Sequence, residues 1–391
     1  MVGCDSCWCI SYRDIKKTIF SIFMAVNNIN ICWITPNYFL DTDIYVMRYL
    51  SDIFIIKWII TKKRGESFDY HNLIREIEHK TNVVVEIAEL DGRRYSVKGL
   101  LYEWRLQRET KNADIIYQPV GLPYSLPLTL LFGHRSNSII PLHNVRTPRG
   151  GSRYLINKVS TWLTIHLFRN FITFSQSQQV LLQTLNKQAN VLYAPFMLKD
   201  FGRASVKRSN SKITFLCFGN IRRYKRIDVL IEAAQKAYEL TNRPFRVIIA
   251  GRCDNWGDYQ KKIKYSELFD IRIQRIKDND IPNLFEECDY FVTPYQDIAQ
   301  SGSLIVGINY NKPIIASRLE AFEEYVEDGE SGFLIRPANL EDLTKVMIQI
   351  LKEHHNIYEK LKAGQKKMIS EKFDDKIIVS KYVDFISGIA K

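Results

Sequence analysis

The sequence predicts a two-domain α/β protein in which each domain is a Rossmann-like, doubly wound parallel sheet. The 391 residues exceed what one hydrophobic core usually organises, so two domains of similar size are expected. Strand-like apolar runs alternate with helical patterns along both halves, which indicates βαβ units. These runs carry little polar alternation, as expected for strands that helices cover on both faces.

The first succession of elements occupies the N-terminal half. A strand over 29–34 ends at a Thr-Pro-Asn turn, and a helix is predicted over 43–52. Further strands are predicted, with helical patterns between them, over 54–60, 83–87, 115–117, 138–142 and 171–174. The stretch 199–212 is rich in Lys, Arg, Ser, Asp and Asn without an apolar period, which predicts the interdomain linker.

A second succession follows this linker. Strands are predicted over 213–218, 245–250, 271–273, 290–293 and 313–317. Helices are predicted over 226–240, 281–288, 304–309 and 340–352, and a last helical pattern over 358–382 breaks near Phe373-Asp374. The resulting boundaries are an extension over 1–23, an N-terminal domain over 24–200, a C-terminal domain over 201–372 and a final helix over 373–391. Two such domains facing across a cleft bind ligands at the carboxyl ends of their strands.

The N-terminal extension allows three interpretations. Its apolar stretch over 18–26 follows Arg13, Lys16 and Lys17 and is shorter than the roughly 20 residues that span a bilayer. It fits a signal peptide's apolar region, a short interfacial anchor, or a segment upstream of a working start at Met24. The last is favoured because Met24 leads straight into the first strand. We therefore expect a cytoplasmic protein that can attach peripherally to the inner face of the plasma membrane.

The net charge and the cysteines indicate which classes of partner the protein is expected to bind. The formal net charge of +12 favours an anionic membrane surface or phosphorylated ligands, with a lysine-rich solvated surface as the alternative. No nucleic-acid-binding motif accompanies the charge, so no nucleic acid is expected. Cys4, Cys7 and Cys9 have no second Cys/His pair at zinc spacing, so no metal is expected. The other four cysteines (Cys32, Cys217, Cys253 and Cys288) lie in or beside apolar runs and are expected to be reduced core residues.

Two strand-to-helix turns in the C-terminal half are suited to phosphate. Gly219 follows the strand over 213–218 and permits a close backbone approach to a ligand. Arg222 and Lys225 come just before the next helix, whose N-terminus favours anions, so both can contact a diphosphate. The alternative is a charged loop that leads into an amphipathic helix.

The second turn follows the strand over 290–293. Ser301, Gly302 and Ser303 begin a helix there, and their backbone amides suit phosphate oxygens. An ordinary serine N-cap without a ligand is the alternative. Two such turns at one edge of a domain favour phosphate binding over either alternative.

Residues 213–340 resemble the donor-binding domain of the family 4 retaining glycosyltransferases. The resemblance lies in the segments FGNIRRYKRIDVLIEAAQ, VIIAGRCDN, IPNLFEECDYFVTPY, SGSLIVGINYNKPIIAS and EEYVEDGESGFLI. It implies a GT-B fold whose final helix crosses back to the N-terminal domain. It also implies that Lys225 holds the donor diphosphate with Arg222, because Asn220 stands where the family has its Arg, and that Gly251 follows the central strand.

One departure from this family concerns its pair of glutamates, which are separated by seven residues. Neither register of this sequence supplies a carboxylate: the two positions fall on Ile298 and Val306, or on Ala299 and Gly307. The sequence resembles a subgroup with an Asp-x-x-Gln-Ser-Gly loop. In that subgroup Asp297 takes the role of the first glutamate, and Gln300 with the Ser301 and Gly302 amides helps to hold the donor.

The resemblance also marks residues outside these two turns. His143, at the end of the strand over 138–142, is expected to face the donor sugar, and Glu324 matches the family's Glu after the strand over 313–317. Candidate acceptor-binding residues are Asn37, Arg146, Arg149 and Arg153. For the His, Glu and Arg residues, a structural or solvated role is the alternative.

The resemblance implies transfer of a sugar from a nucleoside-diphosphate sugar to a glycan or lipid-linked glycan, with retention and without a metal ion. Such a reaction would suit the assembly of a bacterial surface polysaccharide. The triplets Asp41-Thr42-Asp43 and Asp278-Asn279-Asp280 are interpreted as acidic helix starts and not as metal ligands. Two alternatives are a nucleotide-sugar epimerase on the same fold and a catalytically inactive partner subunit. The missing glutamates favour the inactive subunit and count against an epimerase.

Overall fold

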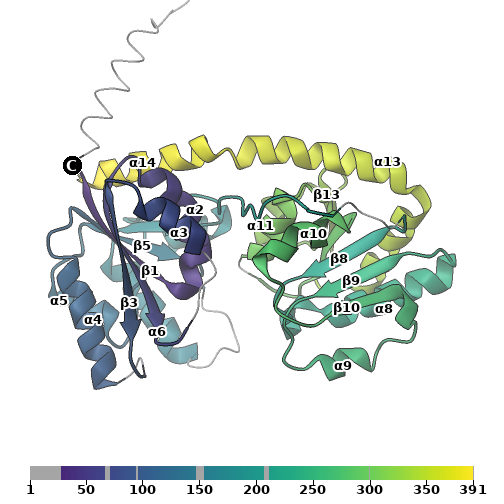
Figure 1. Ribbon diagram of the computed structural model, residues 1–391, viewed down its shortest axis with the longest axis horizontal. Helices are drawn as coiled ribbons and strands as arrows, with labels where there is room; N and C mark the ends of the chain where they lie inside the picture. Colours follow the sequence, from purple (N-terminus) through teal and green to yellow (C-terminus); the bar gives the residue numbers. More distant parts are fainter. Residues whose placement is uncertain are drawn as a thin grey trace, which may run out of the picture.

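The computed structural model describes residues 28–66, 71–93, 96–146, 154–206, 211–298 and 300–390. Two parallel sheets lie side by side with helices on their faces, and a long C-terminal helical segment runs along both (Figure 1). The extension over 1–23, with its three cysteines, lies outside the described residues, as do Met24, Arg149 and Arg153. No helix in the described ranges is long and apolar enough to cross a membrane.

The N-terminal sheet has the strand order β3-β2-β1-β4-β5-β6-β7. Its strands are β1 (Asn30–Pro36), β2 (Ile55–Lys63), β3 (Val83–Leu90), β4 (Ile115–Tyr117), β5 (Ser138–Leu142), β6 (Asn170–Thr173) and β7 (Asn190–Tyr193). Its helices are η1 (Asn37–Phe39), α2 (Leu40–Leu50), α3 (His71–Glu78), α4 (Val97–Glu109), α5 (Ser125–Leu131), α6 (Tyr154–Leu167) and α7 (Gln176–Leu185). Right-handed crossovers place α2 and α3 on one face and α4 to α7 on the other.

The C-terminal sheet has the order β10-β9-β8-β11-β12-β13. Its strands are β8 (Thr214–Phe218), β9 (Arg246–Ala250), β10 (Phe269–Arg272), β11 (Tyr290–Thr293), β12 (Ile314–Ser317) and β13 (Gly332–Ile335). The helices are η2 (Arg223–Lys225), α8 (Ile227–Thr241), α9 (Trp256–Gln260), η3 (Ser266–Leu268), η4 (Asp278–Asp280), α10 (Ile281–Glu286), α11 (Gly302–Asn309), α12 (Glu320–Glu323), α13 (Leu340–Lys372) and α14 (Asp375–Ala390). The doubly wound architecture predicted for both halves is confirmed.

The long C-terminal segment differs from the prediction in one respect. The helix expected over 340–352 continues to Lys372, with non-helical dihedral angles at Glu353 marking a kink. The break expected near Phe373-Asp374 separates α13 from α14. After this break α14 packs on the N-terminal domain: the Tyr49 hydroxyl donates to the Asp375 carboxylate at 2.6 Å, and the Tyr382 ring lies 6.5 Å from the Trp33 ring. The crossover of the last helix is therefore confirmed.

Both acidic triplets lie at helix starts, as predicted. The second triplet forms η4, directly before α10, and the first lies in the first turn of α2. The fully buried Asp43 carboxyl accepts hydrogen bonds from the Trp33 indole at 3.0 Å, the Thr35 hydroxyl at 2.7 Å and the Tyr117 hydroxyl at 3.0 Å. Burial raises the pKa of Asp43 to about 7 against the opposing effect of these donors. The three bonds fix the first turn of α2, and with it Asp41, against the sheet.

The carboxyl ends of β8 and β9 come unusually close together. A Cβ atom built on Gly251 would lie only 2.2 Å from the Gly219 carbonyl oxygen, and Gly251 has a φ of +144°. The Gly219 amide also donates to the Ala250 carbonyl at 2.9 Å. Only a glycine fits at position 251, so this residue sets the path of the loop after β8.

Gly251→Ala is expected to destabilise the protein by about 1–3 kcal/mol through overpacking, with the strained backbone adding to that cost. Urea unfolding followed by circular dichroism measures the change. Gly257→Ala is the matched control, because Gly257 lies in α9 and a Cβ there meets nothing within 4 Å. Equal unfolding midpoints for the two variants would contradict the close approach.

Candidate active site

A cavity of about 310 Å³ lies where the two domains and the segment between them meet. It brings together seven of the predicted donor-binding residues: Gly219, Asn220, Lys225, Gln300, Ser301, Gly302 and Ser303. The loop after β8 and the N-terminus of α11 supply these residues. Asp41 of α2 and Lys199 line the cavity from the other side.

Lys225 is the buried cation of this cavity. Its side chain is only 6% exposed, and its ammonium nitrogen lies 5.2 Å from the centre of the Tyr295 ring. Burial opposes its charge, but Tyr295 and Cys217 outweigh that effect and leave the pKa of Lys225 above its ordinary value. Among the described residues no carboxylate forms an ion pair with Lys225. A buried ammonium group without a carboxylate partner is suited to bind an anion.

The N-terminus of α11 lines the same cavity as Lys225. Ser301 is the N-cap, and its hydroxyl accepts from the Leu304 amide at 3.3 Å. The Ser303 hydroxyl lies 3.0 Å from that of Ser301 and 3.1 Å from the Tyr295 hydroxyl. The helix therefore presents its free amide groups and the positive end of its dipole to the cavity. The serine N-cap, which was the alternative interpretation of this turn, is present at Ser301. It lines the same cavity as Lys225.

Lys199 is a second buried cation that sequence analysis assigned only to the linker. It is 4% exposed and forms an ion pair with Asp41. A Cβ built on Gly302 would lie 3.4 Å from the Lys199 ammonium, so this charge lies next to the start of α11. Nothing in the local sequence distinguishes Lys199 from its charged neighbours, because its burial depends on how the linker crosses the cleft.

His143 follows β5 and is enclosed by aromatic rings. Its ring centre lies 3.6 Å from that of Phe39, 4.9 Å from that of Phe174 and 5.5 Å from that of Phe196. Burial lowers the pKa of His143 to about 3, although Asp41 and a contact with Gln300 act in the opposite direction. The imidazole is therefore neutral at physiological pH.

Three buried polar atoms near this imidazole have no hydrogen-bond partner among the described residues. They are the His143 Nε2 atom and the two side-chain amide atoms of Gln300. Buried polar groups are normally paired, so atoms of this kind indicate where a ligand would supply the missing bonds. That His143 faces the donor sugar and that Gln300 helps to hold the donor stay predictions.

Arg222 and Asp297 do not line the cavity. Arg222 is exposed, pairs with Asp254 at 2.7 Å and lines a neighbouring pocket of about 530 Å³. Asp297 is exposed on the loop after β11. The tight turn of η2, which ends at the left-handed Arg226 with a φ of 50°, turns Lys225 inward, while the extended backbone of Arg222 before that turn points its side chain outward. Their donor-binding and catalytic roles stay predictions.

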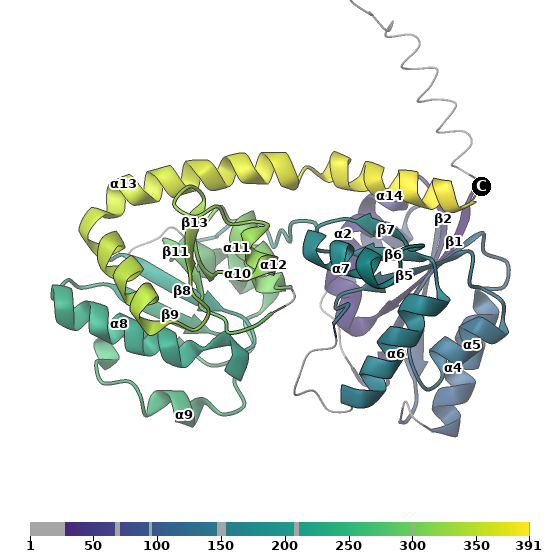
Figure 2. The same cartoon turned by 180° about the vertical axis from the view of Figure 1, so that it is seen from behind.

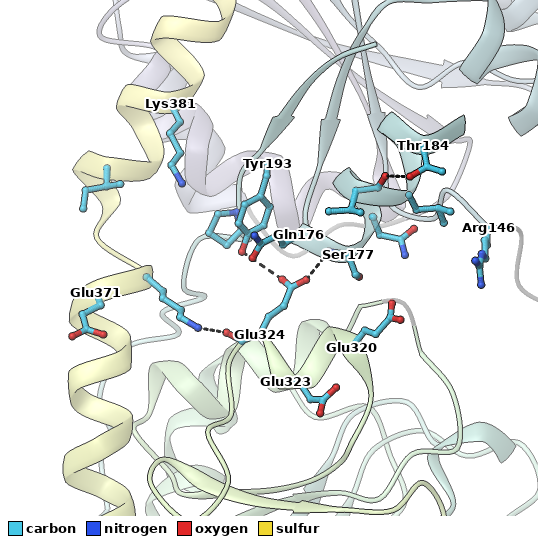
Figure 3. Close-up of a pocket in the computed structure, with 16 residues that line it drawn as sticks. Arg146, Gln176, Ser177, Thr184, Tyr193, Glu320, Glu323, Glu324, Glu371 and Lys381 are labelled. Atoms are coloured by element: carbon cyan, nitrogen blue, oxygen red, sulfur yellow. Dashed lines mark hydrogen bonds between the residues drawn. The ribbon is translucent and has the colours of Figure 1, made fainter. Parts of the chain in front are cut away.

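Glu324 lies in a different pocket, of about 860 Å³, between α7, α12 and the junction of α13 with α14 (Figure 3). Its carboxylate accepts from the Ser177 amide at 3.1 Å and from the Tyr193 hydroxyl at 3.4 Å. Burial raises its pKa. The glutamate thus caps α7 of the opposite domain and links the two domains.

The remaining predicted residues lie apart from the donor cavity. Arg146 is exposed and lines the pocket of Glu324, and Asn37 lines a separate pocket of about 370 Å³ beside β2. Within the described ranges no group of three or more His, Cys, Asp or Glu residues could hold a metal ion, and four cysteines are free thiols. The prediction that the site needs no metal stays a prediction.

Several solved structures share this fold. A glycosyltransferase from Rickettsia africae has a TM-score of 0.70 at 16% identity, covering 93% of this chain and 99% of its own. Anabaena Alr3699/HepE in complex with UDP and glucose has a TM-score of 0.67 at 16% identity, covering 92% and 100%. Sucrose-phosphate synthase from Thermosynechococcus elongatus has a TM-score of 0.69 at 14% identity, covering 91% and 97%. At these identities the likeness concerns the fold.

The comparison with curated proteins found no match. The comparison with protein families matched residues 199–368 to the family described as "Glycosyl transferases group 1". The matched segment begins at Lys199 and includes both phosphate-suited turns of the cavity. The family match covers residues 199–368, less than half of the 391-residue chain; together with the GT-B fold it identifies the protein as a glycosyltransferase.

Proposed function

We propose that this enzyme transfers a sugar from a nucleoside-diphosphate sugar to a hydroxyl group of a glycan or lipid-linked glycan. The observation that carries the proposal is the meeting of two buried lysines, Lys225 and Lys199, with the N-terminus of α11 in one cavity. Cations and a helix N-terminus together suit a diphosphate. The structures of similar fold include Alr3699/HepE with UDP and glucose and the pneumococcal O-GlcNAc transferase GtfA with UDP and GlcNAc.

In the proposed reaction the bond between the anomeric carbon and the diphosphate oxygen breaks, and a bond to the acceptor oxygen forms. Negative charge grows on the departing diphosphate, while the acceptor hydroxyl loses its proton. Lys225, Lys199 and the α11 amides would stabilise that charge in a site with little water. They would do what a divalent ion does in other transferases, so the proposal needs no metal. Retention of configuration rests on the resemblance to family 4.

Asp41 is proposed to take the place of the missing glutamates. It is the one carboxylate among the described residues that line the cavity, whereas Asp297 points to solvent. The ion pair with Lys199 holds the Asp41 carboxylate at the cavity wall. From there it can bind a hydroxyl group of the donor sugar or receive the proton of the acceptor. His143 and Gln300 would then bind further sugar hydroxyls through their unpaired atoms.

A catalytically inactive partner subunit is the second candidate. The missing Glu pair and the exposed position of Asp297 favour it. The buried Lys225, which has no carboxylate partner among the described residues, favours an active donor site, because a bound anion would supply that partner. No comparable observation favours an epimerase.

The donor site can be tested with Lys225→Ala. At 100 times its Kd, a bound nucleotide stabilises the wild-type fold by about 2.7 kcal/mol, which is visible as a thermal shift. UDP, GDP, ADP and CMP are each screened with and without EDTA. We expect one nucleotide to stabilise the wild type in EDTA, no shift in the variant, and turnover reduced on the order of 10²–10³-fold.

Arg223→Ala is the matched control for this experiment, because Arg223 is an exposed cation of the same 3₁₀ helix. It should retain the nucleotide shift and the turnover of the wild type. Near-wild-type turnover of Lys225→Ala would refute the donor site. Absence of any nucleotide shift in the wild type would favour the inactive partner.

The neutral imidazole of His143 predicts a specific pH behaviour. Because burial lowers the pKa of His143 to about 3, the ring stays uncharged between about pH 5 and 8. His143→Asn should lower kcat about tenfold, because the variant loses about one hydrogen bond to the transition state. It should not change the shape of the pH–rate profile. His166→Asn, at an exposed histidine of α6, is the control and should change neither quantity. A wild-type inflection near pH 6.5 that disappears in His143→Asn would contradict a neutral ring.

A further inference from the structure

Three neighbouring helices on one face of the N-terminal sheet expose large apolar side chains. Figure 2 shows α4, α5 and α6 together on this side of the domain. We define the α4–α6 face by nine exposed residues: Val97, Leu100, Leu101, Trp104, Leu131, Leu155, Ile156, Val159 and Trp162. Large exposed apolar side chains gathered on neighbouring helices of a folded domain indicate an interaction site.

Helix α6 exposes an apolar stripe. Leu155, Val159 and Trp162 follow this stripe at intervals of four and three residues, with exposures of 72%, 51% and 58%. The inner side of the helix is mixed: Leu163, Ile165 and Leu167 pack in the core, and Ser160 and Thr164 are buried polar residues. The Ser160 hydroxyl accepts from the Leu122 amide at 3.0 Å. An ordinary surface helix has no apolar stripe on its outer side.

Helix α4 also exposes an apolar stripe. Leu101 and Trp104 are exposed, whereas Glu103, Leu106 and Gln107 are buried against the domain. The Gln107 amide donates to the Gln118 side chain at 2.8 Å. Two of the three helices of this face, α4 and α6, therefore expose an apolar stripe that contains a tryptophan.

The exposed charged side chains on α4, α5 and α6 are all basic: Lys98, Arg105, Arg108 and Lys158. Carboxylates beside these helices pair with two of them, since Lys98 lies 3.9 Å from Asp91 and Arg105 lies 3.5 Å from Glu86. Arg108 and Lys158 form no ion pair among the described residues. The Arg108 guanidinium lies 4.9 Å above the Trp104 ring.

We propose that the α4–α6 face binds the surface of an anionic lipid bilayer. Tryptophan side chains with basic neighbours suit the boundary between headgroups and acyl chains. Each basic residue near such a surface adds electrostatic attraction. A second copy of this chain is a poorer occupant, because a symmetric contact would bring the same cations together.

This orientation would serve a lipid-linked acceptor, although the surface itself is inferred independently of the proposed function. The chain passes from His143 at the end of β5 to α6, and Leu155 and Ile156 lie in the first turn of that helix. The apolar stripe of α6 therefore starts at the cleft end of the helix. An acceptor head group could enter the cleft from the bilayer on which the domain rests.

The test is flotation of the full chain with vesicles. We expect binding to vesicles of phosphatidylcholine and phosphatidylglycerol in equal parts, much weaker binding to phosphatidylcholine alone, and weakening by salt. The double variant Val159→Ser/Trp162→Ser should bind the mixed vesicles on the order of tenfold more weakly, because it removes apolar contact without changing charge. Lys98→Glu/Arg108→Glu should show a loss of similar size on the mixed vesicles only.

Leu240→Ser is the matched control, because Leu240 is 64% exposed on α8 of the other domain. It should bind like the wild type. Thermal unfolding of each variant establishes that it folds; should Val159→Ser/Trp162→Ser unfold, Leu101→Ser on α4 takes its place. Sedimentation equilibrium tests self-association through the same surface.

Two outcomes would overturn the proposal. One is unchanged vesicle binding in all variants of the α4–α6 face, which would assign any membrane affinity to another part of the chain. The other is a wild-type dimer that ignores vesicles and dissociates in Val159→Ser/Trp162→Ser, which would make this face a contact between copies.

Discussion

The candidate site depends on the close approach of two backbone segments, at Gly219 and Gly251. Because no side chain fits between them, the loop after β8 is held against the end of β9. That loop then enters η2, and the turn leaves Lys225 buried beside the Tyr295 ring. The same ring's hydroxyl contacts Ser303 in the first turn of α11. One steric constraint thus fixes both the cation and the helix N-terminus that together form the anion site.

The architecture could be predicted from the sequence because most central strands are continuous apolar runs. The strands over 115–117, 138–142 and 290–293 were predicted with the bounds that the structure has. The edge strands β7 and β13 were not predicted, although each is a four-residue strand with three consecutive apolar residues, 191–193 and 333–335. The length of α13 was underestimated because its long path along the domain surface requires only a sparse apolar stripe.

The site was predictable only where local sequence determines it. Gly219, Lys225 and the Ser301–Ser303 turn each follow a strand and precede a helix, so their positions could be inferred from order alone. Lys199 and Asp41 could not, because their meeting requires the linker, α2 and α11 to come together from three parts of the chain. The outward direction of Arg222 depends on its extended backbone before the 3₁₀ turn of η2, which residue type does not indicate.

Helices α4 and α6 of the N-terminal domain are held in their orientation by hydrogen bonds. Rotating α4 would separate Gln107 from Gln118, and rotating α6 would separate Ser160 from the Leu122 amide. Each rotation would leave buried polar atoms unpaired, at a cost of about 1–3 kcal/mol for each atom. The outward direction of the two tryptophans is therefore determined by the polar interior beneath them. Among the described residues the two stripes are left exposed, which suits the proposed contact with a bilayer surface.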